Sequence, residues 1–347
     1  MSIRSYDFGV WTAAIAAHQL IHERMADYLD PYLVEGTGSA PDFTVSVDIS
    51  TDPHRLLDQA GVNTIGCQVR RSHPEYRYRA WLLAGRTMLA PLHRVDHVIT
   101  VDGRHLAVSA REHVAATIGV RVARQLIMRG GESAGGHCVH AGAVELDGVG
   151  VLVGGRPGAG KTSVLTHLIE RHGAVPVSND RTMLMPTDSG DWTAVAVPLA
   201  WRISPEANAA SPRLRTALAS ASPIRGRGLV DGKLEWTPAE IGRILGVSCA
   251  PATSPQRIVI LMRANHRTGH PSTHLLRRHL GFGNADFFTD DWLSLRPSPS
   301  GGGGAGTETG SWWSTLADVP ASVLGWTEPD QIASVADTIA DGMRSLV

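Results

Sequence analysis

The feature that most constrains this chain is a glycine-rich segment between a predicted strand and a predicted helix. Residues 155–162 read GRPGAGKT and fit the pattern G-x-x-x-x-G-K-S/T of a phosphate-binding loop. The apolar run 149–153 predicts the strand that enters the loop, and the spacing of apolar residues in 162–171 predicts the helix that leaves it. This strand, loop and helix are the structural context that the pattern needs in order to bind phosphate.

The residue types of this loop favour the binding of an anion. Glycine lets consecutive backbone N–H groups converge on one point, and the following helix adds the positive end of its dipole. We expect nucleotide contacts from Gly155, Arg156, Pro157, Gly158, Ala159, Gly160, Lys161, Thr162 and Ser163. Lys161 would place a charge on the β- and γ-phosphates of ATP, and the Thr162 hydroxyl would bind Mg2+. The alternative is a glycine-rich turn followed by a surface lysine.

Length and charge narrow the class of protein. A chain of 347 residues exceeds the usual domain size of roughly 100 to 200, which predicts two domains. Its 32 basic and 33 acidic residues nearly balance, which argues against nucleic acid as the main partner. Cys67, Cys138 and Cys249 lie far apart and indicate reduced thiols. No apolar run approaches membrane-spanning length, so we expect a cytoplasmic protein that has no membrane contact.

The N-terminal third predicts a smaller α+β domain over residues 1–130, whose role the sequence does not indicate. Residues 43–47 alternate between apolar and polar, as a half-buried strand does. Two apolar runs around an Asp-Gly pair in 98–108 predict a hairpin. Apolar residues every four positions from Val114 to Leu126 predict a helix, which we expect Gly130 and Gly131 to end.

A second domain is expected over residues 137–347, with the phosphate-binding loop near its start. Its other elements are expected as strands at 139–146, 174–177, 194–199 and 257–262 and as helices at 162–171, 238–245 and 332–343. Gly173 has the favoured residue type for a helix C-terminus, whereas Pro176 counts against a central position for its strand. Residues 297–311, with four glycines in a row, are expected to form a flexible loop.

The stretch from His140 to Leu184 resembles the catalytic domain of HPr kinase/phosphorylase and related kinases with the phosphoenolpyruvate carboxykinase-like fold. His140, the glycine-rich loop and the segment 179–181, with sequence Asn-Asp-Arg, stand where that family has a histidine, a Walker-type loop and an acidic pair followed by arginine. The segment 223–226 resembles the family's second signature, with Pro223 in place of its glutamate. The resemblance implies an α/β fold: a P-loop kinase domain with a mixed sheet, preceded by the smaller domain.

The resemblance also implies roles for individual side chains. Lys161 would hold the phosphates, Thr162 and Asp180 would place Mg2+, His140 would tune the carboxylate, and Arg225 would face the developing charge. Asn179 departs from the family, because its amide cannot act as the base that takes the proton from the acceptor. Either Asp180 is the remaining carboxylate, or the transfer needs little base catalysis.

Several of these residues keep a second interpretation. His140 could be structural at a strand entrance, Asp180 could cap a turn, and Arg225 could be solvated. His137, Cys138 and His140 invite a metal-site interpretation, but no second ligand cluster is spaced to complete a zinc site. Tryptophans including Trp201, Trp236, Trp312 and Trp313 could line an acceptor pocket, although packing explains most of them. Residues 266–279, rich in His and Arg, could bind an acidic acceptor or form a solvated face.

Together these observations predict an ATP-dependent, Mg2+-requiring kinase. Its acceptor would be a hydroxyl of a peptide, a protein or a natural-product small molecule, and a homo-oligomer is expected from the family. The main alternative is a nucleotide-binding regulatory ATPase or switch that phosphorylates no acceptor, which Asn179 favours. A second alternative is a small-molecule resistance kinase with an enclosed pocket.

Overall fold

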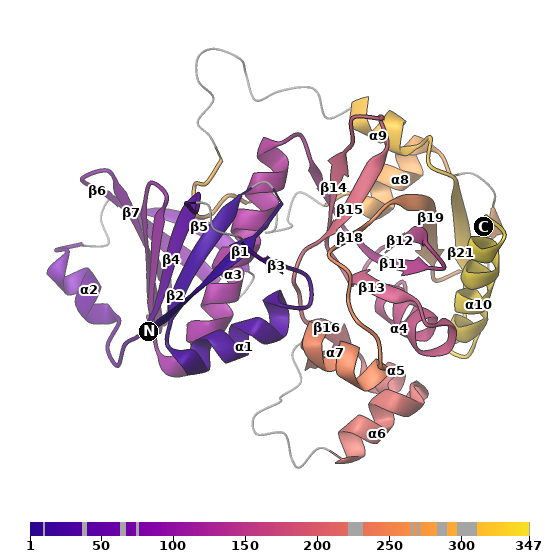
Figure 1. Cartoon of the computed structure of the whole chain (residues 1–347), viewed down its shortest axis with the longest axis horizontal. Coiled ribbons are helices and arrows are strands. Elements are labelled where there is room, and N and C mark those ends of the chain that lie inside the picture. Colours follow the sequence, from indigo (N-terminus) through magenta and orange to yellow (C-terminus); the bar gives the residue numbers. More distant parts are fainter. Residues whose placement is uncertain are drawn as a thin grey trace. The chain divides into compact units, whose positions relative to one another are not determined.

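A computed structural model describes residues 1–9, 11–36, 40–62, 67–73, 76–220, 232–264, 267–268, 271–282, 290–296 and 311–346. The chain divides into two compact units. Unit 1 comprises Met1–Ala134 and Gly283–Ser298, and unit 2 comprises Gly135–Phe282 and Pro299–Val347 (Figure 1). Both are mixed α/β structures built on mixed sheets, as the sequence predicts at this coarse level.

Unit 1 is built on a nine-stranded sheet in the order β3-β1-β2-β4-β9-β8-β7-β6-β5. Its strands are β1 Ser2–Asp7, β2 Thr12–Ala17, β3 Val34–Glu35, β4 Phe43–Ile49, β5 Gln68–His73, β6 Tyr76–Leu83, β7 Arg86–Pro91, β8 His97–Asp102 and β9 His105–Ala110. The pairs β2–β4 and β4–β9 are parallel and the other pairs are antiparallel. The strand predicted at 43–47 and the hairpin at 98–108 are confirmed.

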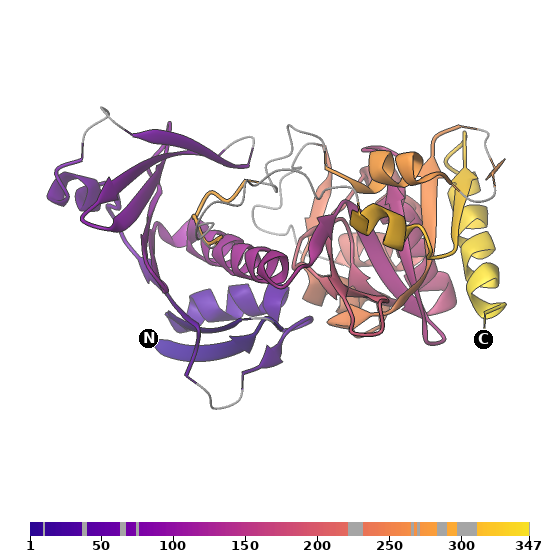
Figure 2. The ribbon, with the colours of Figure 1, turned by 90° about the horizontal axis from the view of Figure 1, so that it is seen from above.

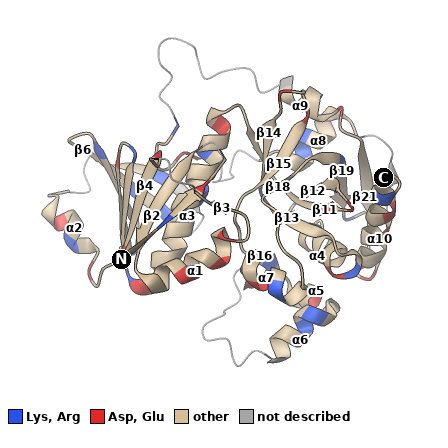
Figure 3. Cartoon of the chain, in the orientation of Figure 1, with Lys and Arg blue, Asp and Glu red and all other residues tan. Residues whose placement is uncertain are grey.

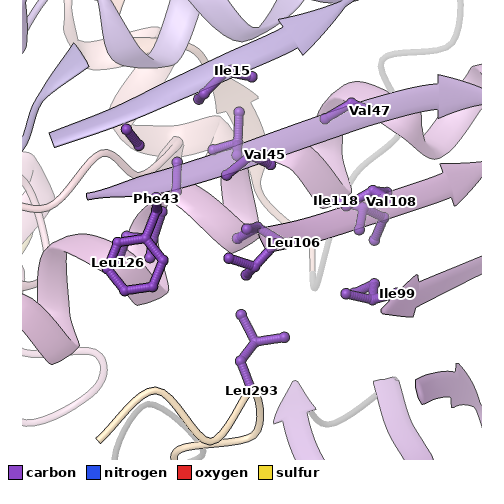
Figure 4. Packing of buried hydrophobic residues seen from close by; sticks show 14 of the residues in the cluster. Ile15, Phe43, Val45, Val47, Ile99, Leu106, Val108, Ile118, Leu126 and Leu293 are labelled. Carbon is purple, nitrogen blue, oxygen red and sulfur yellow. The ribbon is translucent and has the colours of Figure 1, made fainter. Parts of the chain in front are cut away.

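Three helices accompany this sheet: α1 Gln19–Leu29, α2 His54–Gln59 and α3 Glu112–Ser133. Figure 2 shows α1 and α3 lying side by side against one face of the sheet, and the two helices contact each other. The core between them and the strands contains Ile15, Val45, Val47, Ile118 and other buried apolar residues (Figure 4). The alternation of β4, with Phe43, Val45 and Val47 buried, places these side chains on the helix-covered face.

Helix α3 continues past the two glycines that were expected to end it. It runs to Ser133, and Gly130 and Gly131 are buried within it. A Cβ atom at Gly130 would lie 3.1 Å from the Trp11 ring, so glycine here permits the helix to approach that indole closely. The prediction that Gly130 stops the helix was wrong, because this glycine serves packing and not helix termination.

Residues 290–296 lie within the range expected for the second domain, but they group with unit 1. Trp292 stacks on Tyr78 with ring centroids 5.0 Å apart and an interplanar angle of 11°, and Leu293 is fully buried in the same core (Figure 4). The Arg70 guanidinium donates a hydrogen bond of 3.0 Å to the carbonyl oxygen of Trp292. This aromatic contact and hydrogen bond attach the segment to unit 1.

Unit 2 contains a six-stranded sheet in the order β13-β11-β12-β19-β21-β20, a four-stranded sheet β10-β14-β15-β18 and the pair β16-β17. The strands are β10 His137–Val139, β11 Ala141–Leu146, β12 Val149–Gly155, β13 Val175–Ser178, β14 Thr182–Pro186, β15 Trp192–Ala196, β16 Trp201–Ile203, β17 Leu234–Trp236, β18 Ala252–Thr253, β19 Pro255–Met262, β20 Arg267–Thr268 and β21 Ala321–Gly325. In the six-stranded sheet β12, β19 and β21 are parallel, whereas β11, β13 and β20 pair antiparallel to their neighbours. Strand β13 lies at the edge of this sheet, which explains how it accommodates Pro176.

The helices of unit 2 are α4 Lys161–His172, α5 Pro205–Ala210, α6 Pro212–Ser220, α7 Pro238–Leu245, α8 Thr273–Leu280, α9 Ser311–Leu316 and α10 Gln331–Arg344. Helices α4 and α10 pack together and bury apolar faces in the core of the six-stranded sheet (Figure 1). Gly173 ends α4 in the left-handed conformation, with φ of 74°, as its position predicts. The helices predicted at 162–171, 238–245 and 332–343 are confirmed, and the strand predicted at 194–199 ends at Ala196.

Charged residues of both signs are distributed along the elements of both units (Figure 3). Within the described ranges, the helices are all too short or too polar to cross a lipid bilayer.

Candidate functional site

The phosphate-binding pattern forms the connection between β12 and α4. Three of its glycines have positive φ: 152° at Gly155, 81° at Gly158 and 90° at Gly160. A Cβ atom at Gly155 would lie 2.9 Å from both the Ala159 Cβ and the carbonyl oxygen of Leu261, so a side chain would not fit there. The loop tightens through a hydrogen bond from the Ala159 N–H to the Arg156 carbonyl oxygen, 3.0 Å long. The result is a compact glycine-lined turn at the N-terminus of a twelve-residue helix.

Lys161 is the first residue of α4, and its side chain is 7% exposed. The ammonium group donates to the Gly155 carbonyl oxygen at 2.8 Å, lies 3.0 Å from His140 Nε2, and is 3.9 Å from Asp180 Oδ1. Burial, with a further contribution from the nearby Arg181 charge, lowers the pKa of Lys161 to about 8, although Asp180 acts in the opposite direction. At neutral pH the lysine therefore retains its charge.

His140 occupies the single residue between β10 and β11, where the chain passes from one sheet of unit 2 to the other. Its backbone N–H donates to the Leu280 carbonyl oxygen at 2.7 Å, which ties this point to the end of α8. Its Nε2 lies 3.0 Å from Asp180 Oδ1. Burial lowers the pKa of His140 more than the hydrogen bond to Asp180 raises it, so the ring is neutral near pH 7.

Asp180 lies in the turn between β13 and β14 and gathers positive groups around its carboxylate. Oδ1 faces His140 and Lys161, and Oδ2 accepts a hydrogen bond from Arg181. Burial acts to raise the pKa of Asp180, but the charge of Arg181 and the hydrogen bond from His140 outweigh it and hold the pKa far below its usual range. The carboxylate is thus ionised at every pH at which the protein would operate, and 40% of its side chain is exposed.

The Nε2 atom of His140 has two partners and can serve one of them at a time. When Nε2 carries the proton it donates to Asp180, and when it does not it accepts from the Lys161 ammonium group. Movement of Lys161 toward a bound anion would therefore leave His140 with a satisfied hydrogen bond to Asp180. The cluster can therefore release its lysine without leaving the Nε2 atom of His140 unpaired.

The structure also places Asn179, which stands where the resembled family has its base. Asn179 is buried, and its Nδ2 donates to the Ala200 carbonyl oxygen at 2.7 Å. This hydrogen bond gives the amide a structural role in joining the end of β13 to the segment before β16. The carboxylate of the cluster is that of Asp180.

Phe282 also borders this cluster, and sequence reasoning did not identify it. The Phe282 ring is parallel to the His140 ring, with centroids 6.1 Å apart and an interplanar angle of 6°. The Arg181 guanidinium lies 4.9 Å from the Phe282 centroid, a cation–π contact. His279 on α8 is buried, and its pKa is lowered by burial and by the charges of Arg156, Arg278 and Lys161, so α8 contributes basic groups near the loop. Figure 3 shows the basic residues of α8 in blue. No local pattern marked Phe282, because its role depends on tertiary contacts.

The remaining predicted residues do not all enter this cluster. Thr162 and Ser163 lie in the first turn of α4, whereas Arg225, the segment 223–226 and the glycine-rich residues 297–310 lie outside the described residues. Trp201 and Trp236 face each other across β16 and β17 and are buried in the core of unit 2, so packing accounts for them.

Aromatic residues also gather beside the four-stranded sheet. Trp312 stacks on His137 with ring centroids 4.3 Å apart, and Trp192 and Trp313 contact Trp312 in turn. His137 therefore takes part in an aromatic stack. In the part of the chain that the structure describes, no three His, Cys, Asp or Glu side chains are grouped to hold a metal ion.

A cation could still bind here together with a nucleotide. Mg2+ is commonly held by one or two protein oxygens, with phosphate oxygens and water completing its coordination. An ionised Asp180 carboxylate and a Thr162 hydroxyl are hard oxygen donors of the kind that Mg2+ requires. The donor chemistry of the site fits such an ion.

Comparison with protein-family models and with curated proteins found no match to this chain. The site combines a glycine-lined loop, a buried lysine and an ionised carboxylate held by histidine and arginine.

Proposed function

We propose that unit 2 is an ATP-dependent kinase that transfers the γ-phosphoryl group of ATP to a hydroxyl group. One observation carries this proposal: three side chains from separate parts of the chain, Lys161, His140 and Asp180, contact one another beside the glycine-rich loop. A carboxylate that is oriented by its own histidine and lies beside the loop lysine suits a site that positions an acceptor hydroxyl as well as a nucleotide.

Binding would begin with the loop and its lysine. The backbone N–H groups of residues 156–162 would surround the phosphates, and the helix dipole of α4 would add to their field. Lys161 would exchange its contacts to Gly155 and His140 for phosphate oxygens. Burial favours this exchange, because a charge that is only partly compensated in a buried place gains more from a phosphate than an exposed lysine does.

Mg2+ would be held by Thr162 and Asp180 and would supply neutralisation of phosphate charge when bound. Asp180 would also accept a hydrogen bond from the acceptor hydroxyl and so orient its oxygen for attack. The pKa of this carboxyl lies far below its usual range, which makes it a weak base. We therefore assign most of the rate acceleration to positioning and electrostatics, which a loose phosphoryl-transfer transition state permits.

His140 and Arg181 would act through Asp180. The histidine holds one carboxylate oxygen and the arginine the other, so the plane of the carboxylate is fixed from two sides. Phe282 contacts the His140 and Arg181 side chains and limits their movement. We expect substitutions of His140 to lower the rate of transfer more than the affinity for nucleotide.

We further propose that the fold of unit 2 is of the HPr kinase-like, phosphoenolpyruvate carboxykinase-like type. The mixed six-stranded sheet supports this proposal, since the strand that enters the loop has an antiparallel neighbour, β11, and a parallel one, β19. An all-parallel sheet would instead have favoured the fold of ordinary P-loop NTPases. The acceptor would be a serine-type hydroxyl of a peptide or protein or of a natural-product small molecule, and we propose a cytoplasmic homo-oligomer.

A nucleotide-binding switch is the second candidate, and the position of Asn179 favours it. The Asn179 amide is engaged with Ala200, and the neighbouring Asp180 is a weak base, so a site that binds ATP without phosphorylating an acceptor is chemically reasonable. Such a protein would bind nucleotide with the same loop and lysine. It would differ in leaving every acceptor unlabelled.

The test is mass spectrometry after incubation of the full chain with Mg-ATP and a panel of serine peptides, hydroxylated natural products and cell extract. Lys161→Ala and Asp180→Asn are the test variants. Arg24→Ala is the control, because it removes one exposed positive charge from α1 of unit 1, whereas Lys233 is avoided since its charge acts on Lys161. An acceptor that gains one phosphoryl group with the wild type and control, and not with the test variants, supports the kinase. ATP binding without transfer to any acceptor supports the switch.

A further inference from the structure

Trp326 lies against the phosphate-binding loop although it is far from it in sequence. It is the first residue after β21, and its backbone N–H donates to the Met262 carbonyl oxygen at 3.0 Å, at the end of the neighbouring strand β19. The side chain is 6% exposed and belongs to the core cluster of unit 2, together with Ala159 of the loop. The indole is thus held by the central sheet and reaches the loop from outside the segment that carries the motif.

The indole contacts both residues of one peptide group in the loop. Its Nε1–H donates to the Ala159 carbonyl oxygen at 2.8 Å, and this hydrogen bond is buried. A Cβ atom at Gly160 would lie 3.1 Å from Trp326 Nε1 and 3.2 Å from its Cζ2. Gly160 has φ of 90°, a conformation that glycine adopts readily and other residues rarely adopt. Glycine at this position therefore serves two needs, the backbone turn and the space for the indole.

The direction of this hydrogen bond fixes the direction of a loop N–H group. In a planar trans peptide the C=O and N–H bonds point to opposite sides. Because the Ala159 carbonyl points to the indole, the Gly160 N–H points to the other side, away from Trp326. A rotation of this peptide by half a turn would bring the carbonyl oxygen to that side, where its negative end would repel a phosphate.

We propose that Trp326 is a positioning residue that holds the Ala159–Gly160 peptide with its N–H toward the phosphate-binding side of the loop. This inference rests on the proposed function, since it assumes that the loop binds phosphate. Arg263 lies with its guanidinium carbon 5.4 Å from the Trp326 ring centroid, directly after β19. The indole is therefore held through the ends of β19 and β21, and the loop conformation is set before any ligand arrives.

The test compares Trp326→Phe with Trp236→Phe. Both substitutions keep an aromatic ring and remove one buried indole N–H: that of Trp326 to Ala159, and that of Trp236 to Asn208 Oδ1 at 3.0 Å. Titration calorimetry of the full chain would use two probes, Mg-ADP and inorganic tripolyphosphate. We expect Trp326→Phe to weaken both probes about tenfold, the effect of losing one well-aligned hydrogen bond. Trp236→Phe should lower the melting temperature about as much as Trp326→Phe does. It should leave both affinities within about twofold of the wild type.

The outcomes separate this inference from the function on which it rests. A wild type that binds neither probe overturns the proposed function and this inference with it. Equal affinities for the wild type and Trp326→Phe overturn the inference alone, and so does a loss confined to ADP, which would mean that the indole contacts the base. If Trp326→Phe does not fold, the Trp326 indole N–H of the wild type is followed by NMR. Slow exchange with water supports the hydrogen bond to Ala159, and rapid exchange overturns it.

Discussion

On the proposed function, the buried Lys161 should make phosphate binding depend on pH in a range where its neighbours do not titrate. The pKa of Lys161 is about 8, whereas those of His140 and Asp180 lie below their ordinary values. Between pH 7 and 9 the histidine thus stays neutral and the carboxylate stays ionised. In the proposed site the ammonium form of Lys161 binds phosphate, so we expect the affinity for phosphate to be greatest below pH 8 and to be lost as the pH rises through 8.

The size of the effect follows from the protonated fraction of Lys161. With a pKa of about 8, this fraction falls from about nine-tenths at pH 7 to about one-tenth at pH 9. The dissociation constant for ADP should therefore rise about tenfold, which is about 1.4 kcal/mol of binding free energy. The terminal phosphate of ADP loses its last proton near pH 6 and contributes little over this range. An ordinary lysine, with a pKa of about 10.4, would produce almost no change.

Two assays measure the pH dependence of ADP binding and the pKa of Lys161. Titration calorimetry with Mg-ADP at three pH values gives the affinities, and Lys161→Arg is the control, because an arginine stays charged throughout and should give a flat profile. The chain contains two lysines, Lys161 and Lys233, so protein labelled with 13C at the lysine ε-carbons gives two NMR signals. The signal that Lys161→Arg removes should titrate near pH 8, and ADP should move its midpoint upward.

Either of two results would refute this reasoning. A Lys161 midpoint near 10 would mean that burial does not depress its pKa. A tenfold loss of affinity that persists in Lys161→Arg would mean that another group is responsible for the pH dependence.

Three further predictions concern other parts of the chain. Asp180→Asn should abolish acceptor phosphorylation and move the Lys161 midpoint below 8, because the Asp180 charge raises the pKa of Lys161; 13C NMR of the variant checks this. Gly150→Ala would place a Cβ atom 2.2 Å from the Ser254 carbonyl oxygen and should cost about 3 kcal/mol in urea unfolding, against about 1 kcal/mol for Gly148→Ala, where space is open and φ is 80°. Tyr78→Phe removes a 2.6 Å hydrogen bond to the buried His97 and should cost about 1 to 3 kcal/mol, measured in the same way; no change in stability would contradict it.

Local sequence signals were enough to predict the elements that hold the loop. The apolar strand that enters the loop and the apolar stripe of α4 each act over fewer than about a dozen residues, and the structure places both as expected. The spacing of His140, Lys161 and Asp180 along the chain does not by itself bring them together. Their placement depends on the pairing of β11 with both β12 and β13, and no local pattern predicts this strand order.

The failures share a physical cause, namely contacts between residues far apart in sequence. Gly130 has the residue type of a helix terminator, yet here it makes room for Trp11. Trp326 has no local signal at all, because its partner Ala159 lies 167 positions away. Trp292 lies in the range expected for the second domain, whereas its ring stacks on Tyr78 in unit 1. A pattern read along the chain cannot report a partner that only the fold supplies.

The return of residues 290–296 to unit 1 limits how a gene of this kind can be rearranged. Trp292 and Leu293 complete the core of unit 1, but their codons lie within the part of the gene that encodes unit 2. A single recombination event at codon 134 would therefore separate unit 1 from two of its core residues and leave the Tyr78 ring uncovered. Exchange of unit 1 between genes requires the codons of its two chain segments to move together. Because most of unit 2 is encoded between these segments, the two units should be inherited together.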